Sequence, residues 1–341
     1  MYGLHPWQNE IGALGRQTPS MRFSGNMPLH IWQCAARAKL ETLLGMEYFH
    51  RCDELFSIES VEDKGDRSET RFVFQTEEGY FVPCVFVKPK KPRCEKPPVM
   101  ICLQGHSTGM HNSLGVVKYP GDAEDVESGD RDYAVQCAEL GLCAVTLEQR
   151  CFGECGGTPN PDCYTSAMTA ILSGRTVLGG RVWDVERLID VLETHFADEC
   201  DVNSVYCMGN SGGGTATIYA TALETRIKGA IPSCSFCTFL DSIGNKWHCA
   251  CNYVPGIAKY FDMAELGGMI APRPLTIVTG KTDPIFPSDA AAQEFARVRD
   301  IYYKEAGAPE MCAQVIGDGG HRFYKADAWP VFFRMTEASE V

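Results

Sequence analysis

The sequence lacks any long hydrophobic run. No stretch approaches the roughly 18 consecutive apolar residues that a membrane-spanning helix requires, so we expect no membrane partner. The first residues, 1–25, are rich in polar residues and glycine and contain no apolar core of the kind that marks a secretory signal peptide. We therefore expect a cytoplasmic protein.

Positive charge is also scarce. Lysine and arginine number 31 against 44 aspartate and glutamate residues, which gives a formal net charge of -13. Nucleic-acid binding depends on basic side chains that neutralise phosphates, so this composition argues against a nucleic-acid partner. A small neutral or cationic molecule is the better expectation, and a homo-oligomer stays open.

Zinc-type cysteine spacing is missing, although the chain has 17 cysteines. Cys234 and Cys237 form the sole C-x-x-C pair, with no second pair or histidine pair at a matching spacing. The odd count and the length of the chain argue against a disulfide framework. Several cysteines fall inside apolar runs, where a free thiol packs as a small hydrophobic group. We expect reduced thiols and no metal or other cofactor.

Short apolar segments alternate with amphipathic helical ones along most of the chain, and there is no internal repeat. Residues 1–60 are interpreted as an irregular arm (1–27) followed by a helix over 28–46. Residues 61–341 are interpreted as one α/β domain with long insertions at about 148–174 and 233–261. Strands 71–76 and 80–88 predict an antiparallel hairpin at one edge. The remaining alternation predicts a mainly parallel central sheet with helices on both faces.

A strand-like run, 202–208, leads into Gly209-Asn210-Ser211-Gly212-Gly213. This Gly-x-Ser-x-Gly pattern between a strand and a helix is typical of a nucleophile elbow. The turn is so tight that its flanking positions need glycine, and the serine is held in a strained conformation. Ser211 is therefore the candidate nucleophile.

A serine hydroxyl needs a base, usually a histidine that a carboxylate orients. Asp283 follows the predicted strand 275–280, and His321 follows the predicted strand 312–316. Catalytic groups of such sheets lie on loops at the carboxyl ends of the strands. Either residue alone is equally consistent with a turn or a helix cap, but the order Ser211, Asp283, His321 is that of one class of hydrolases.

Attack on an ester also needs two donors for the developing negative charge. The backbone N–H of Gly212 is one candidate. The second is the N–H of His106 in Gln104-Gly105-His106, directly after the strand predicted at 99–103. His106 and His111 are also candidate metal ligands, but no carboxylate stands at a matching spacing.

Other polar and aromatic residues follow strands or lie in the insertions. Arg150 and Glu148 come after the strand predicted at 142–147, so Arg150 either supports the oxyanion loop, pairs with Glu148, or forms a surface ion pair. Gln104 is a further candidate for support. Trp247, in the aromatic insertion 233–261, either roofs the substrate pocket or packs in a satellite core.

Together, the elbow, the two loops and the Gln-Gly-His segment resemble the α/β-hydrolase superfamily. The stretch 262–287, with Asp283-Pro284-Ile285-Phe286-Pro287 at its end, is similar to the acetyl-xylan-esterase-like and dienelactone-hydrolase-related branch. The resemblance implies the α/β-hydrolase fold and a serine esterase that forms an acyl-enzyme without a cofactor. It implies Ser211, His321 and Asp283 as the triad and the amides of His106 and Gly212 as the oxyanion hole.

The chain departs from the cephalosporin-C deacetylases of carbohydrate esterase family seven. It has Arg150-Cys151-Phe152-Gly153 where they have Arg-Gly-Gln-Gly, Gly212 where they have glutamine, and Phe323 where their His-x-Glu has glutamate. Acetyl-sugar specificity therefore does not carry over directly. The expected activity is a serine carboxylesterase that removes a short acyl group, acetyl first, from a carbohydrate or similar alcohol. A dienelactone-hydrolase-like or peptidase-type enzyme and a catalytically idle binding protein of the same fold are the alternatives.

Overall fold

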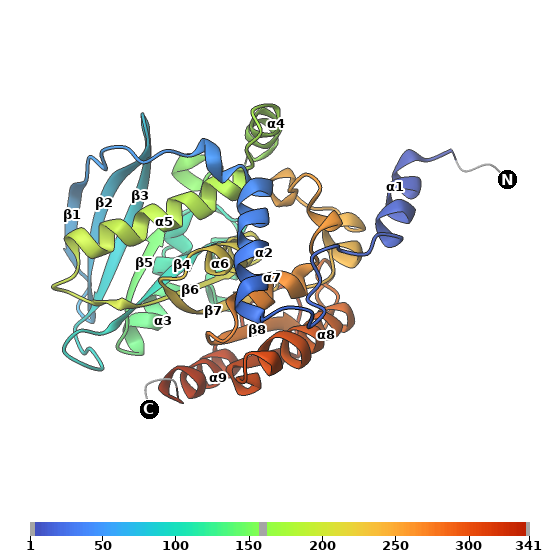
Figure 1. Ribbon diagram of the computed structural model, residues 1–341. Helices are drawn as coiled ribbons and strands as arrows, with labels where there is room; N and C mark the ends of the chain where they lie inside the picture. Colours follow the sequence, from blue (N-terminus) through green and yellow to red (C-terminus); the bar gives the residue numbers. More distant parts are fainter. Residues whose placement is uncertain (1–3, 157–161, 339–341) are drawn as a thin grey trace.

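The computed structural model describes residues 4–156 and 162–338, and within them one nine-stranded sheet forms the centre of the molecule (Figure 1). Its order is β1-β2-β3-β5-β4-β6-β7-β8-β9. The pairs β1–β2, β2–β3 and β3–β5 are antiparallel, and every later pair is parallel. The strands are β1 Ser57–Asp63, β2 Arg67–Glu77, β3 Tyr80–Pro89, β4 Pro98–Leu103, β5 Cys143–Leu147, β6 Asp201–Asn210, β7 Ile227–Ser233, β8 Leu275–Gly280 and β9 Cys312–Gly317. The predicted mainly parallel sheet with an antiparallel edge is confirmed, with β1 as an edge strand that was not predicted.

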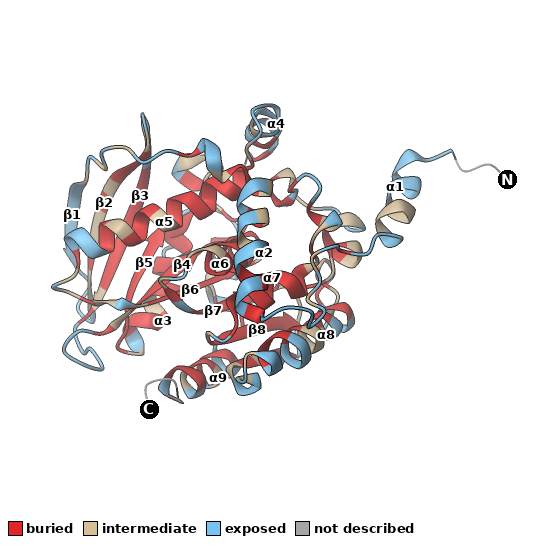
Figure 2. Ribbon diagram, viewed as in Figure 1, coloured by how far each residue is buried: buried red, intermediate tan, exposed pale blue. Residues whose placement is uncertain are grey.

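Helices cover both faces of this sheet, so the central strands are buried on both sides, as Figure 2 shows in red. This explains why these strands consist of nearly continuous apolar runs. The hydrophobic core on one face includes residues of α2 Leu29–Leu44, α5 Val177–His195, α6 Gly212–Leu223, α7 Met263–Ile270 and α8 Ser288–Arg297. The other face packs against α3 Tyr133–Glu139 and α9 Lys325–Ala338. In the part of the chain that the structure describes, no helix combines the length and apolarity needed to cross a bilayer.

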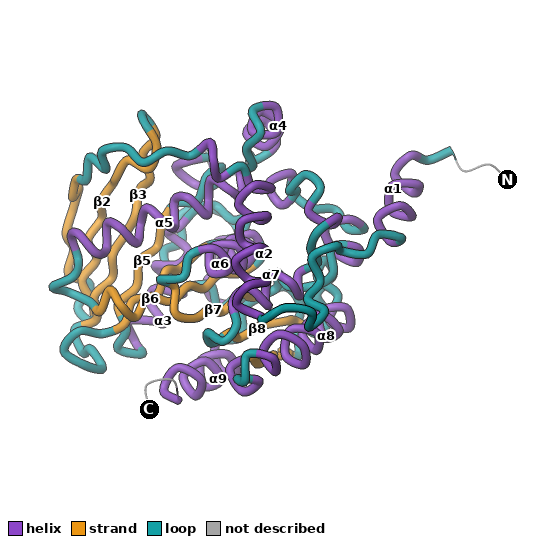
Figure 3. The backbone as a smooth tube through the Cα atoms, viewed as in Figure 1, coloured by secondary structure: helices purple, strands orange, loops and turns teal. Residues whose placement is uncertain are grey.

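The N-terminal arm is more regular than its composition predicts. Residues 1–3 lie outside the described part, but the next segment forms α1, Pro6–Gly15, which begins at a proline in the first turn. Proline suits this position because its fixed φ matches the helix and the missing N–H has no partner there. Figures 1 and 3 show α1 beside the body of the molecule, where it contacts the turn Leu240–Gly244 of the second insertion. The prediction of an irregular arm was wrong for this segment.

Both predicted insertions contain short helices. The first, 148–174, carries α4, Tyr164–Leu172, which was not predicted; its residues 157–161 lie outside the described part. The second, 233–261, is built from the single turns Leu240–Gly244, Ala250–Asn252 and Ile257–Lys259. Neither insertion adds a strand in its described residues, and both lie near the carboxyl ends of the parallel strands.

Candidate active site

Ser211 lies on the turn between β6 and α6, in a backbone conformation that residues other than glycine rarely adopt. Its φ of 57° and ψ of -123° place it outside the normal regions for an L-residue. The turn is this tight because β4, β6 and α6 approach each other closely. A Cβ atom on Gly213 would lie 2.0 Å from the carbonyl oxygen of Leu103, and one on Gly209 would lie 2.5 Å from it. Such strain persists only where the surroundings enforce it, which is typical of functional residues.

Asp283 and His321 follow β8 and β9, and their side chains meet. His321 Nδ1 lies 2.8 Å from Asp283 Oδ2, while Asp283 Oδ1 accepts the backbone N–H groups of Ile285 and Phe286 at 3.0 Å each. Burial raises the pKa of Asp283, but the hydrogen bonds and the neighbouring imidazole outweigh it, so the pKa lies below its usual range. An ionised Asp283 makes Nδ1 the protonated nitrogen of His321, and Nε2 is then the nitrogen that can accept a proton.

Ser211 and His321 line one cavity of about 480 Å³. The second insertion supplies one wall of it. Trp247 stands at the rim with 87% of its surface exposed, and the ring of His248 packs edge-on against Phe286. The other lining residues are His106, Arg131, Gly212, Cys249, Asn252, Ile285 and Phe286. The structure thus gathers the predicted nucleophile, base and insertion residues around one space, and Trp247 is not part of a satellite core.

The loop after β4 brings His106 next to the elbow. A Cβ atom on Gly212 would lie 2.8 Å from both Nδ1 and Cε1 of His106, so residue 212 must be glycine for this imidazole to fit. A Cβ atom on Gly105 would similarly lie 3.1 Å from the Cβ of Ser211. Both predicted oxyanion residues therefore border Ser211.

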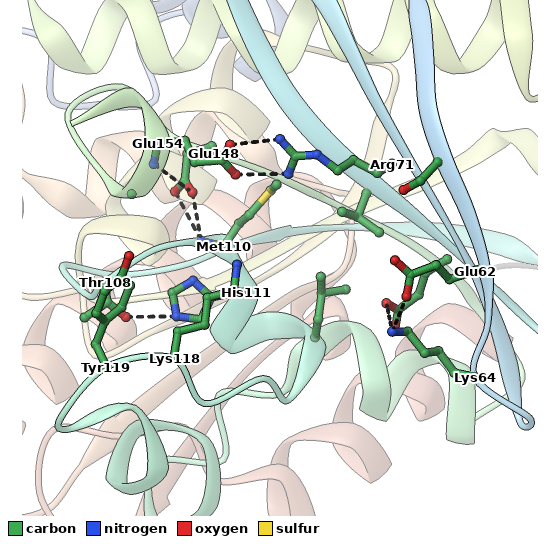
Figure 4. Close-up of a pocket in the computed structure, with 15 residues that line it drawn as sticks. Glu62, Lys64, Arg71, Thr108, Met110, His111, Lys118, Tyr119, Glu148 and Glu154 are labelled. Carbon is green, nitrogen blue, oxygen red and sulfur yellow. Dashed lines mark hydrogen bonds and ion pairs between the residues drawn. The ribbon is translucent and has the colours of Figure 1, made fainter. Parts of the chain in front are cut away.

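Glu148 anchors this loop from behind. Its Oε1 accepts a hydrogen bond from Gln104 Nε2 at 2.5 Å. Both carboxylate oxygens accept the backbone N–H of Met110, at 3.1 and 3.2 Å, as Figure 4 shows. The side-chain amide of Gln149 donates to the Gln104 carbonyl oxygen. Burial raises the pKa of Glu148 to about 7, and these hydrogen bonds only partly oppose that rise. Gln104 and Glu148 thus contact each other and hold the segment that carries His106.

Arg150 does not pair with Glu148, which corrects one of the three interpretations of this residue. Its guanidinium forms a two-pronged ion pair with Asp184, at 2.8 and 2.7 Å, and a further pair with Glu77 at 2.7 Å. Asp184 is fully buried on α5, so its charge requires a cationic partner, and Arg150 supplies it. Arg150 therefore joins the turn after β5 to α5 and β2, and it is not a surface ion pair.

Glu148 also lines a second polar pocket, of about 420 Å³, which Figure 4 shows. The ion pair between Arg71 and Glu154 borders it. His111 also faces it, with Nε2 at 2.9 Å from Asp122 Oδ2. That contact uses His111 in local loop structure, so His111 does not join His106 in a common ligand set.

A cluster of cysteines surrounds the other side of the His106 ring, and the sequence analysis missed it. The ligand atoms of His106, Cys163, Cys249 and Cys251 all lie within 4.8 Å of one another. The one signal in the sequence is the close spacing of Cys249 and Cys251, because the other two residues come from distant segments. A set of three thiols and an imidazole can hold a metal ion that prefers sulfur and nitrogen. Cys234, Asp283 and His321 form a second group within the same limit.

Comparison with known proteins finds the same architecture in solved structures of esterases. No family model matches the sequence. The chain is 24% identical over 251 residues, 72% of its length and 79% of the relative's, to the candidate hydrolase YtaP of Bacillus subtilis (strain 168). Its structure is similar to that of a candidate acetyl xylan esterase from Bacteroides fragilis NCTC 9343, with a TM-score of 0.77, 15% identity, and coverage of 98% of this chain and 90% of that one.

Two further solved structures have the same architecture. A glucuronoyl esterase from Solibacter usitatus has a TM-score of 0.67 at 14% identity, with 94% of this chain and 97% of that chain covered. An acetyl xylan esterase from Paenibacillus sp. R4 has a TM-score of 0.59 at 17% identity, with 96% and 98% covered. The structural neighbours are thus acetyl xylan esterases and related carbohydrate esterases, and the chain has the α/β-hydrolase fold.

Proposed function

We propose that the protein is a serine carboxylesterase that hydrolyses a short acyl ester, acetyl first, of a carbohydrate or similar alcohol. One observation carries this proposal: the Asp283–His321 hydrogen bond of 2.8 Å lies at the strand ends that border the same cavity as Ser211 on its strained turn. An oriented imidazole and a partly exposed serine that line the same cavity are the groups that acyl transfer requires.

In the proposed mechanism, Ser211 Oγ attacks the ester carbonyl and His321 Nε2 takes its proton. Asp283 stays ionised and stabilises the imidazolium that forms. The backbone N–H groups of Gly212 and His106 donate to the carbonyl oxygen as it becomes negative. His321 then passes the proton to the leaving alcohol oxygen. A water molecule, activated by the same histidine, hydrolyses the acyl-enzyme and restores Ser211.

The carbohydrate half of the proposal rests on the architecture. Structural neighbours of the chain are named as acetyl xylan esterases and glucuronoyl esterases. The cavity over Ser211, at about 480 Å³, is large enough for a sugar residue. The exposed indole of Trp247 at its rim offers an apolar face with a polar edge. We propose a small-molecule or oligosaccharide ester as the substrate. A cytoplasmic location fits the 17 free thiols.

Ser211→Ala tests the assignment, with Ser204→Ala, from the opposite end of β6, as the matched control. Activity is measured on p-nitrophenyl esters of increasing chain length, on acetylated xylo-oligosaccharides, on a methyl glucuronate ester and on aminoacyl amides. Ser211→Ala should lose about 10³- to 10⁶-fold in kcat and all labelling by a fluorophosphonate probe. Ser204→Ala should keep both.

Undiminished turnover by Ser211→Ala would refute the serine mechanism. Preference for long acyl chains or amides would replace the short-acyl esterase with a lipase-like or peptidase-type enzyme. Folded wild-type protein that neither turns over these substrates nor takes the label would be an idle member of the fold.

A further inference from the structure

Four potential metal ligands converge beside the elbow from three separate loops. His106 follows β4, Cys163 precedes the first turn of α4, Cys249 precedes the turn Ala250–Asn252, and Cys251 lies within that turn. His106 Nε2 lies 3.2 Å from Cys251 Sγ and 3.9 Å from Cys163 Sγ. Cys163 and Cys251 are buried, whereas His106 and Cys249 are partly exposed toward the cavity.

These separations match a tetrahedral zinc site. With Zn–S bonds of about 2.3 Å and Zn–N bonds of about 2.0–2.1 Å, tetrahedral ligands lie about 3.8 Å apart for two sulfurs and about 3.6 Å apart for sulfur and nitrogen. The two measured N···S distances lie on either side of that value, and no pair in the cluster exceeds 4.8 Å. A small adjustment of side chains is enough to place one ion between all four atoms.

Arg181 supplies an independent observation, because it is a buried cation that points at the cluster. Only 1% of Arg181 is exposed, and its guanidinium donates to Cys251 Sγ at 3.4 Å and to Cys163 Sγ at 3.7 Å. Its other hydrogen bonds go to the carbonyl oxygen of Arg150, and within the described residues no carboxylate pairs with it. A buried guanidinium needs an anion nearby.

A zinc complex provides that anion. Three thiolates and a neutral imidazole around Zn²⁺ carry a net charge of minus one, and the guanidinium of Arg181 balances it. Three neutral thiols would leave the guanidinium without a counter-charge. The ligand types also select the metal, since thiolates with imidazole favour zinc over magnesium or calcium.

We propose that His106, Cys163, Cys249 and Cys251 form a structural zinc site that ties both insertions to the loop bordering Ser211. All four positions are filled by protein, so the ion takes no substrate and acts as a cross-link. Coordination through His106 Nε2 leaves Nδ1 as the protonated nitrogen, and Nδ1 is on the side of the ring that faces Gly212. The site thus fixes the position of a loop that the proposed oxyanion hole uses, and its existence does not depend on the esterase activity.

Metal content tests the site directly. Protein expressed with added zinc, purified in reductant and dialysed, should contain about one zinc ion per chain by mass spectrometry, and Cys163→Ser and Cys251→Ser should each contain less than about 0.2. Cys34→Ser, at an exposed thiol, is the general control. Cys234→Ser is the specific control, because it would lose the metal only if zinc bound the group of Cys234, Asp283 and His321.

Cobalt gives a readout that does not depend on the variants folding. Adding Co²⁺ to metal-free wild-type protein should produce a thiolate-to-cobalt charge-transfer band and the strong visible bands of a tetrahedral site. Wild-type protein with no more zinc than the Cys163→Ser and Cys251→Ser variants would overturn the proposal. So would the absence of the cobalt bands, a disulfide between these cysteines in reductant-treated protein, or zinc that is lost in Cys234→Ser and kept in Cys251→Ser.

Discussion

Two histidines border Ser211, and their surroundings differ in origin and in chemistry. His321 is paired with a carboxylate, and both residues sit at ends of parallel strands. His106 is surrounded by thiols that come from the insertions, with a buried arginine behind them. The sheet fixes the first group through its own hydrogen bonds. The second group depends on loops that the sheet does not hold, which is where a cross-linking ion has the most to stabilise.

The largest effect is expected from removing the charge of Asp283, which should impair the surroundings of His321 and leave those of His106 intact. Asp283→Asn should lower kcat on p-nitrophenyl acetate by about 10³- to 10⁴-fold, because the imidazole loses its orientation and the imidazolium its counter-charge. The zinc content should stay that of the wild type. Asp318→Asn is the matched control, since Asp318 is fully exposed in the loop before His321. Equal activity in both variants would contradict the assigned role of Asp283.

The next largest effect is expected at Arg181, beside the cluster of His106, Cys163, Cys249 and Cys251. Arg181→Met should lower the melting temperature of zinc-loaded protein by roughly 5–10 °C, because it leaves a buried anionic complex unpaired. In metal-free protein the same substitution should cost much less, since no anion then needs the guanidinium. Scanning calorimetry of the wild type and of Arg181→Met, each with and without zinc, measures the difference. An equal or higher melting temperature for the zinc-loaded variant would show that Arg181 faces no anion.

A smaller effect is expected at Glu148, which holds the loop that carries His106. Burial raises the pKa of Glu148 from 4.5 to about 7, so its contribution to stability is present below the ordinary value and is lost as the pH rises toward 7. Glu148→Gln cannot titrate. The free energy of unfolding of Glu148→Gln, relative to that of the wild type, should therefore be about 1–3 kcal/mol higher at pH 8 than at pH 5.

Urea unfolding at the two pH values measures this gain. Glu154→Gln is the control, because Glu154 is an exposed carboxylate in the same turn and pairs with Arg71. A difference from the wild type that stays constant with pH would contradict the raised pKa.

The smallest effect is expected at the rim. Trp247→Ala should raise KM about 2- to 5-fold for an acetylated oligosaccharide and leave p-nitrophenyl acetate unaffected, because in the proposed function the exposed indole contacts the sugar and not the reacting ester. Its stability should match that of the wild type. Trp7→Ala, an exposed tryptophan on α1, is the control. Equal effects on both substrates would place Trp247 closer to the reacting atoms than we propose.

The sheet and its strand-end residues could be predicted because local patterns determine them. Strands buried on both faces leave apolar runs in the sequence, and α7 begins with a local pattern of the same kind, a capping box formed by Asp262 and Glu265. The neighbourhood of Ser211, Asp283 and His321 follows, since parallel strands bring their carboxyl ends together. β1 escaped prediction because all its residues are exposed, and α1 has no buried residue to create a stripe.

The remaining contacts depend on tertiary structure that no short pattern encodes. Arg150 pairs with Asp184 on α5, and this contact exists only because α5 packs beside the turn after β5. The cluster around His106 joins residues separated by 57 and 145 positions. A spacing rule written for zinc motifs within one segment cannot detect ligands that three loops contribute separately.

The crowding at the elbow also means that different parts of the sequence tolerate substitution to different degrees. A side chain at Gly209 or Gly213 would collide with the backbone of β4, which cannot yield without disturbing the centre of the sheet. Single substitutions there should be eliminated almost completely in a library selected for folding. Residues such as Trp247, on the insertion, carry no such constraint. Variation in this chain should therefore concentrate in the insertions, while the glycines of the elbow stay unchanged.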